Sequence, residues 1–220
     1  MKKSKRTREI QKRFKVFCEG STEACYFSSL KKDKNLSLVL KPIDMRGGGY
    51  SSFLSKIKVD GNANCIAKFI VIDGDRAAHI SSEKENLKCI FEYCNNQNKK
   101  GIPHILIINC PDFEYVACLH SSKYQEQDIY RFIVDNFGYK DISKFKADEN
   151  IYTLLNSGDN HYSIMLSKIK KNNAVVENKI KVNKSDYSVD VKSIAEFEKL
   201  SRKGTNIHDF FEVLKLFEII

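Results

Sequence analysis

Two aspartates separated by one glycine directly follow an apolar run, in the segment FIVIDGDR at residues 69–76. Asp-Gly often forms an ordinary turn, but closely spaced carboxylates are also the ligands that divalent cations prefer. Asp73 and Asp75 are therefore the first candidates for metal ligands, and Gly74 between them allows close approach of the backbone. The spacing of the surrounding acids does not match a calcium-binding EF-hand loop.

Acidic residues also follow two other apolar runs. Glu19 comes after RFKVFC (13–18), and the segment NCPDFE (109–114) continues HILIINC (104–110). The carboxyl ends of parallel strands meet at one edge of a sheet, and ligands bind there. We therefore expect these acids to bind Mg²⁺, or Mn²⁺ in its place, together with phosphate oxygens of a substrate. The predicted metal ligands are Glu19, Asp73, Asp75 and Glu114, of which the first three are also the predicted catalytic residues.

The elements that must position these acids alternate along the first half of the chain. Strands are predicted at 13–18, 36–45, 68–73 and 104–110, and the last two are near-continuous apolar runs typical of buried parallel strands. Helical patterns at 22–32, 50–58 and 82–95 separate them, and Ser82 and Glu85 have the spacing of a capping box. The alternation predicts an α/β fold with about four mainly parallel strands flanked by helices.

The second half shows mainly helical patterns. They cover 113–120, 125–136, 149–155, 161–171, 191–200 and 207–217, while the polar, lysine-rich stretch 168–188 is expected to be an exposed excursion. Asn206 and Asp209 have the spacing of a helix cap. We therefore predict a basic arm at 1–13, an α/β core at 14–111 and a helical C-terminal lobe at 112–220, with the lobe and core packed into one compact unit.

Several residues are candidates for phosphate contacts. Three glycines in MRGGGYSSF (45–53) precede a predicted helix, whose N-terminus can bind a phosphate, although no Gly-Lys-Ser/Thr completes a Walker A loop. A flexible connector is the alternative interpretation. The predicted nucleic-acid contacts are Arg46, Gly47, Gly48, Arg76 and Lys144.

Charge and cysteine content narrow the class of protein. The net charge is +9, and residues 1–15 alone hold eight Lys or Arg and one Glu. Such an arm, together with the basic stretch 168–184, suits contact with nucleic acid, although both segments also suit a solvated surface. Seven cysteines without a C-x-x-C pair indicate buried thiols in a reducing bacterial cytoplasm, and no apolar run is long enough to span a membrane.

Four ordered motifs resemble the RloB-like family. VFCEGSTEACYF matches its strand-Glu-Gly opening through Glu19, Gly20, Thr22, Glu23, Tyr26 and Phe27; VIDGDRA matches its D-x-D, and NCPDFEYVACLH its P-x-F-E segment, with His120 six residues after Glu114. GTNIHDFF matches its C-terminal T-x-[VI]-H element through Thr205, Ile207 and His208. The chain departs from the family in lacking the tryptophan that usually follows the P-x-F-E glutamate, and in the residues around Asp112.

The resemblance implies a TOPRIM-like fold and a Mg²⁺-dependent centre built from the first-strand glutamate and the D-x-D. It also implies a role in abortive infection or restriction-modification defence against phage, often beside a separately encoded ATPase. Gly20, Glu23 and His120 are expected to support this centre. A helix over 113–120 turns Glu114 and His120 to different faces, so a hydrogen bond within the lobe is the preferred role for His120.

Other functions are compatible with the same residues. The D-x-D also occurs in haloacid-dehalogenase-type phosphatases, although there it usually follows the first strand. A non-catalytic nucleic-acid-binding or regulatory subunit that works with a partner ATPase is the main alternative to a nuclease, and any ATP dependence must come from that partner. A topoisomerase is disfavoured because the chain is too short for a strand-passage domain. DNA and RNA both remain open as substrates, and so does the oligomeric state.

Overall fold

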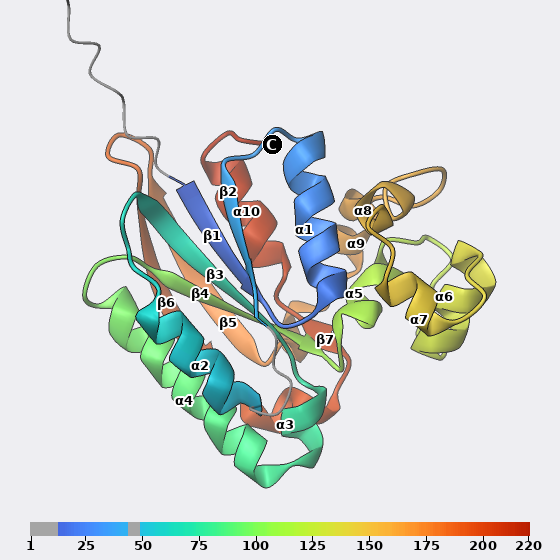
Figure 1. Cartoon of the computed structure of the whole chain (residues 1–220), viewed down its shortest axis with the longest axis horizontal. Coiled ribbons are helices and arrows are strands. Elements are labelled where there is room, and N and C mark those ends of the chain that lie inside the picture. The colour runs from blue at the N-terminus through green and yellow to red at the C-terminus, as the bar shows by residue number, and fades with distance from the viewer. Residues whose placement is uncertain (1–12, 44–48) are drawn as a thin grey trace, which may run out of the picture.

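The computed structural model describes residues 13–43 and 49–220. Its central sheet has the strand order β2-β1-β3-β4-β7, with β1 at Arg13–Cys18, β2 at Leu38–Pro42, β3 at Cys65–Asp73, β4 at His104–Cys110 and β7 at Gly204–Thr205 (Figure 1). The first four strands are parallel, and β7 is antiparallel to β4. The predicted four-stranded parallel sheet is therefore confirmed, with the short fifth strand as an addition.

Helices cover both faces of this sheet. On one face lie α1 (Ser21–Asp33), α5 (Phe113–Leu119) and α10 (His208–Leu216), and on the other lie α2 (Gly49–Val59), α3 (Asp75–His79) and α4 (Ser81–Asn98) (Figure 1). Alternate residues of β3 point to opposite faces: Phe69 and Val71 pack with the first group, and Ile70 and Ile72 with the second. Both faces are thus buried, which explains the near-continuous apolar sequence of β3 and β4.

The remaining helices extend the α1 and α5 side of the molecule. They are α6 (Ile129–Phe137), α7 (Ile142–Lys146), α8 (Ile151–Leu154) and α9 (Tyr162–Lys168), followed by a short 3₁₀ turn, η1, at Lys171–Asn173 (Figure 1). Their buried side chains belong to the same apolar core as β1, β3 and α1. That core therefore continues across the predicted boundary between residues 111 and 112.

The predicted helical C-terminal lobe is confirmed only in part, because it also contains strands. A hairpin of β5 (Val176–Asn183) and β6 (Ser188–Ala195) occupies the predicted excursion and the start of the helix predicted at 191–200, of which only the 3₁₀ turn η2 (Phe197–Ser201) remains. In β6, buried Val189 and Val191 alternate with exposed neighbours, which is the period of a strand with one covered face. The lysines of this hairpin lie on its solvent-exposed face. In the sequence they make the segment look polar, so the alternation of its apolar residues is hard to recognise.

The predicted capping box of α4 is also wrong. The N-cap of α4 is Ile80, without a side-chain bond, and Ser82 lies inside the helix. The nearby Glu83 instead turns toward α2, where its Oε2 accepts the Tyr50 N–H at 2.9 Å. A carboxylate from α4 thus caps the N-terminus of α2, and tertiary contact replaces the local cap.

The segment 204–209 attaches the end of the chain to β4. Thr205 Oγ1 donates to Asn109 Oδ1 at 2.7 Å, and Asn206 Oδ1 accepts the Ile108 N–H at 2.9 Å. Asn206 Nδ2 donates to the Leu106 carbonyl at 2.8 Å and to Asp209 Oδ2 at 2.9 Å. The Asn206 side chain therefore satisfies backbone groups of β4 in the way that a neighbouring strand does.

Asp209 makes folding stability depend on pH. Burial raises the pKa of this carboxyl from 3.8 to about 7, although Asn178 and Asn206 donate hydrogen bonds that lower it. Because the folded pKa is raised, its stabilising contribution is complete below about pH 4 and is lost as the pH rises through 7; the loss is at most about 4 kcal/mol. In chemical denaturation, Asp209→Asn should reduce the fall in stability between pH 5 and pH 8. The exposed Asp190→Asn is the control, and an unchanged slope in Asp209→Asn would contradict the assignment.

Candidate metal centre

The turns after β3 and β4 are bonded to each other. The Gly74 N–H donates to the carbonyls of Asn109 and Pro111 at 2.7 and 3.0 Å, and the Asp75 N–H donates to Pro111 at 2.9 Å. A side chain at Gly74 would collide with the Cys110 sulfur. These contacts join the D-G-D turn to the P-D-F-E turn, so acids from separate motifs are brought to one edge of the sheet.

Asp73 lies at the centre of this edge. Its side chain follows the alternation of β3 onto the α1 and α5 face, and its Oδ1 is buried with no hydrogen-bond partner. Burial, followed by the charges of Glu23, Glu19 and Glu114, raises the pKa of Asp73 well above its usual range. An uncompensated carboxylate in such a place is destabilising unless a proton or a cation neutralises it.

Glu19 lies beside Asp73 but faces mainly the other side of the sheet. Its Oε2 accepts the Asp73 N–H at 3.3 Å, and Asp75, Arg76 and Glu83 are its charged neighbours. Burial is the main cause that raises the pKa of Glu19 to about 7, and Asp75 and Glu83 add to the effect while Arg76 opposes it. The three predicted catalytic residues, Glu19, Asp73 and Asp75, therefore all lie at this edge of the sheet, where Asp75 is exposed and Glu19 is half-buried.

Glu23 has a more central place than the supporting role predicted for it. It lies in the first turn of α1, is 1% exposed, and its Oε1 has no hydrogen-bond partner. Burial, then Glu114 and Glu19, raise the pKa of Glu23 to about 8. A Cβ at Gly20 would collide with the Glu23 carboxylate, so Gly20 contributes by leaving room for this side chain.

Glu114 and Asp112 complete the acidic edge from the start of α5. Burial and the neighbouring Asp112 raise the pKa of Glu114 to about 7, against the effect of Lys146, whose Nζ lies 3.3 Å from Glu114 Oε2. Asp112 is the N-cap of α5, with Oδ1 accepting the Tyr115 N–H at 3.3 Å. Its Oδ2 accepts the Tyr130 hydroxyl at 2.5 Å.

The lysine bonded to an acid of this edge is Lys146, whereas the predicted Lys144 is exposed and its contact with nucleic acid stays a prediction. Both lie in α7, which begins after the N-cap Asp141. Lys146 shares a face with Ile142, which packs against the core, whereas Lys144 is turned about 200° from Ile142 and is exposed. The four-residue spacing from Ile142 was the signal in the sequence that identifies Lys146.

The other predicted phosphate contacts have different outcomes. Arg76 is half-buried and is a charged neighbour of Glu19, as a residue at this edge must be. Arg46, Gly47 and Gly48 lie outside the described residues. At the helix that follows them, Glu83 already accepts the Tyr50 N–H, so an anion from the chain itself occupies part of the predicted phosphate cradle.

His120 does not support the acidic edge. Its Nδ1 bonds to the Val116 carbonyl at 3.0 Å and its Nε2 to the Tyr26 hydroxyl at 3.0 Å. Donation to the carbonyl fixes Nε2 as the acceptor of the Tyr26 proton. Burial lowers the pKa of His120 to about 4, so this neutral residue joins α1 to α5, as the preferred interpretation of the sequence expected.

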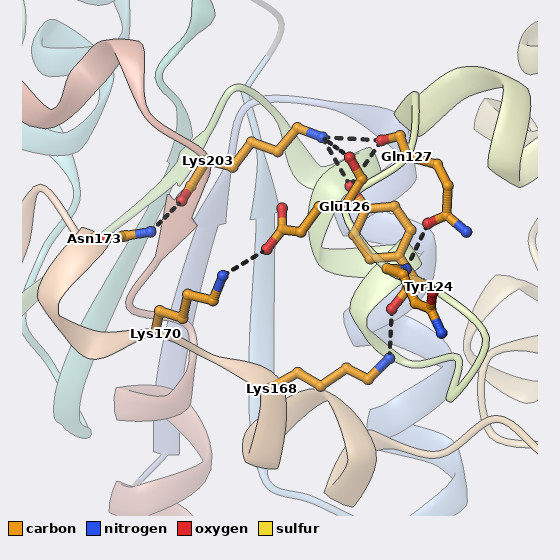
Figure 2. A network of polar contacts seen from close by, with 8 residues as sticks. Tyr124, Glu126, Gln127, Lys168, Lys170, Asn173 and Lys203 are labelled. Atoms are coloured by element: carbon orange, nitrogen blue, oxygen red, sulfur yellow. Dashed lines mark hydrogen bonds and ion pairs between the residues drawn. The ribbon is translucent and has the colours of Figure 1, made fainter.

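Two lysines fix the loop that leads from α5 to α6. Lys168 donates to backbone carbonyls of this loop, those of Ser121 at 2.7 Å, Ser122 at 3.1 Å and Tyr124 at 2.8 Å. Lys203 donates to the Tyr124 hydroxyl and to the carbonyls of Glu126 and Gln127, and Lys170 forms an ion pair with Glu126 (Figure 2). We call residues 121–127 the pinned loop, since cations from two later segments hold its backbone.

The acids are near one another without forming a closed cage. Among residues 13–43 and 49–220, no group of three or more His, Cys, Asp or Glu side chains is arranged to hold a metal ion. Glu19 is bonded to the Asp73 backbone, and Glu114 is turned to Lys146. Side-chain rotation of these two carboxylates is therefore needed before they converge on an ion.

The fold and the site define an α/β protein with an acidic edge on a mostly parallel sheet. Comparisons with family models, with curated proteins and with solved structures give no match. All seven cysteines are free thiols. None of the helices in the described part of the chain has the length and apolar character needed to cross a bilayer.

Proposed function

We propose that this chain is a Mg²⁺-dependent, TOPRIM-type nuclease that hydrolyses phosphodiester bonds of DNA or RNA in prokaryotic defence against phage. The observation that carries the proposal is Asp73: a half-buried residue whose carboxylate Oδ1 is buried without a hydrogen-bond partner, with other acids around it at the carboxyl edge of a parallel sheet. The four motifs that resemble the RloB-like family support the same function.

The donor set fits a hard divalent cation. All the candidate ligands are carboxylate oxygens, the type that Mg²⁺ and Mn²⁺ prefer. The unpartnered Asp73 Oδ1 and Glu23 Oε1 are the atoms that most need a positive neighbour. The residues that would hold the ion are Glu19, Asp73, Asp75, Glu23 and Glu114. When bound, the ion supplies Lewis-acid polarisation of a phosphoryl oxygen.

The chain's own residues account for the other requirements of the reaction. Glu19, whose Oε2 accepts the Asp73 N–H, either holds the ion or exchanges a proton with the attacking water. Arg76 beside Glu19 and the half-exposed Lys146 beside Glu114 supply positive charge for the phosphates of the substrate. The basic arm predicted at 1–13 lies, except for Arg13, outside the described residues, and its contact with the substrate stays a prediction.

Cation binding gives a test that does not require the substrate. We expect Mg²⁺ or Mn²⁺ to raise the melting temperature of the protein at pH 8, because an ion relieves the repulsion among buried carboxylates. At about 100 times the Kd the gain is about 2.7 kcal/mol, which corresponds to roughly 5–10 °C for a chain of this size. The measurement is differential scanning fluorimetry with titration calorimetry, after treatment with EDTA.

Matched variants make this test specific. Glu23→Gln should reduce the cation-dependent shift, whereas Glu92→Gln, on the exposed side of α4, should keep it. An equal shift in both variants would show that the ion binds elsewhere. Cleavage of labelled single-stranded and duplex DNA and RNA, with and without Mg²⁺, then tests the nuclease directly.

A non-catalytic nucleic-acid-binding or regulatory subunit, acting with a partner ATPase, is the second candidate. One observation favours it: the Lys146 ammonium already neutralises Glu114 from within the chain. Under this alternative, Lys146→Met destabilises the protein, and added Mg²⁺ or Mn²⁺ does not raise its melting temperature. Under the nuclease proposal, the same variant binds the cation at least as tightly, because a competing positive charge is lost.

A further inference from the structure

An exposed aromatic ring stands at the acidic edge. Tyr130, the second residue of α6, is 46% exposed, which is unusual for a large side chain among the described residues. Its hydroxyl donates to Asp112 Oδ2 at 2.5 Å, and Asp112 is 5% exposed. The hydroxyl end of the ring therefore faces a carboxylate, while much of the side chain is open to solvent. Partial burial, and then Asp112, Glu114 and Asp75, raise the pKa of the Tyr130 phenol.

The position of this ring is fixed by its surroundings. Asp112 is itself held by the Tyr115 N–H, so the anchor of the hydroxyl is a buried and bonded carboxylate. On the other side, α6 begins at the N-cap Asp128, whose Oδ1 accepts the Arg131 N–H at 2.8 Å. The pinned loop, held by Lys168 and Lys203, precedes that cap directly. A fixed, exposed ring needs little ordering to bind a flat partner.

One cation is bonded to an acid of this edge, and another follows Tyr130 in the sequence. Lys146, with a side chain 46% exposed, is bound to Glu114. Arg131 follows Tyr130 in the chain and is 83% exposed, with a surface contact of 3.5 Å to Asp135. An exposed ring bonded to a carboxylate of this edge offers a contact for a base, and the Lys146 and Arg131 cations offer contacts for the phosphate backbone.

We propose that Tyr130 is a stacking platform for one nucleobase of the substrate, and that the substrate of this edge is single-stranded nucleic acid. The inference rests on the proposed nuclease function and adds its substrate class. In a duplex, both faces of each internal base are covered by neighbouring bases, so an external ring can stack only on an unpaired or terminal base. Glu23 and Glu114, at 1% and 2% exposure, are recessed behind this rim. A flexible strand reaches such acids more readily than a rigid duplex does.

A fluorescent variant tests the stacking directly. The chain contains no tryptophan, so Tyr130→Trp introduces a single reporter at the proposed platform. With Ca²⁺ in place of Mg²⁺, a short single-stranded oligonucleotide should quench its emission at least about twofold on saturation, since a stacked base quenches indole fluorescence. Tyr187→Trp is the control, because Tyr187 is 57% exposed and lines a cavity at the opposite end of the sheet. Its emission should not change.

Binding of a labelled oligonucleotide, followed by anisotropy, completes the design. Tyr130→Ala should weaken single-strand binding roughly 10-fold, and Tyr130→Phe should restore it to within about 3-fold, because the ring and not the hydroxyl makes the contact. Single-strand binding that leaves Tyr130→Trp unquenched overturns the stacking inference and leaves the nuclease proposal standing. Equal quenching by a blunt duplex overturns the single-strand assignment. Failure of the parent protein to bind any nucleic acid overturns the proposed function itself.

Discussion

Asp73→Asn is expected to abolish metal-dependent cleavage and, at the same time, to stabilise the metal-free protein. Burial of Oδ1, followed by the charges of Glu23, Glu19 and Glu114, raises the pKa of this carboxyl well above its usual range. Asparagine keeps the shape of the side chain but removes the charge, so it removes repulsion in the fold and also one of the proposed metal ligands. The loss of cleavage should be on the order of 10²–10³-fold, with a gain in stability at pH 8 of about 1 kcal/mol.

Opposite effects on activity and stability distinguish a functional residue from one needed only for folding. Cleavage rates under single-turnover conditions and urea denaturation of the EDTA-treated protein measure the two quantities. Glu92→Gln, which removes an exposed carboxylate from α4, should change neither. Parental cleavage rates in pure Asp73→Asn protein would refute the metal assignment, and a loss of stability would refute the account of its electrostatics.

Phe210→Ala should cause one of the largest losses of stability available to a single substitution. Phe210 of α10 is fully buried, and its ring centroid lies 4.8 Å from that of Phe69 in β3 and 5.0 Å from that of Phe27 in α1. Truncation leaves a cavity between three elements, at a cost of about 3–5 kcal/mol. The melting temperature should fall by roughly 10 °C.

The half-buried Phe91→Ala is a suitable comparison, because Phe91 on α4 has one aromatic neighbour, Phe197, at 5.9 Å. Its loss of stability, measured by chemical denaturation at equal m-value, should be clearly smaller. Comparable losses in the two variants would show that α10 contributes little to the central core. The affinity for Mn²⁺ should survive in any Phe210→Ala protein that remains folded, since the acids belong to other elements.

The sequence predicted the sheet well for a physical reason. Strands covered on both faces must be apolar throughout, so β3 and β4 are visible as continuous runs, and the acids that follow them are then placed by topology alone. β5 and β6 have one covered face. Apolar and polar residues alternate in these strands, as at Val189 and Val191, but the alternating stretch is short and contains lysines. Its sequence therefore resembles that of a helix or of an unstructured segment.

The predicted site was incomplete where it depends on tertiary contact. Tyr130 of α6 and Lys146 of α7 contact the acids Asp112 and Glu114. The local sequence does not indicate which end of the sheet these two helices pack against, so neither residue was predicted. Glu23 was predicted only as a supporting residue, because its burial depends on α5 packing against α1. His120 carried a motif match, yet its two bonds to Val116 and Tyr26 are specified by packing that the sequence pattern does not reveal.

The pinned loop also has a consequence for the order in which the molecule is made. The acids of β1, β3 and α5 are all synthesised by residue 114, but the cations that fix the loop belong to Lys168 and Lys203, and Thr205 must still pair with Asn109. These closures span 47 to 96 residues, so they form late, after most of the chain has left the ribosome. We therefore expect nascent chains to lack both the fixed pinned loop and the Thr205–Asn109 contact until synthesis is nearly complete.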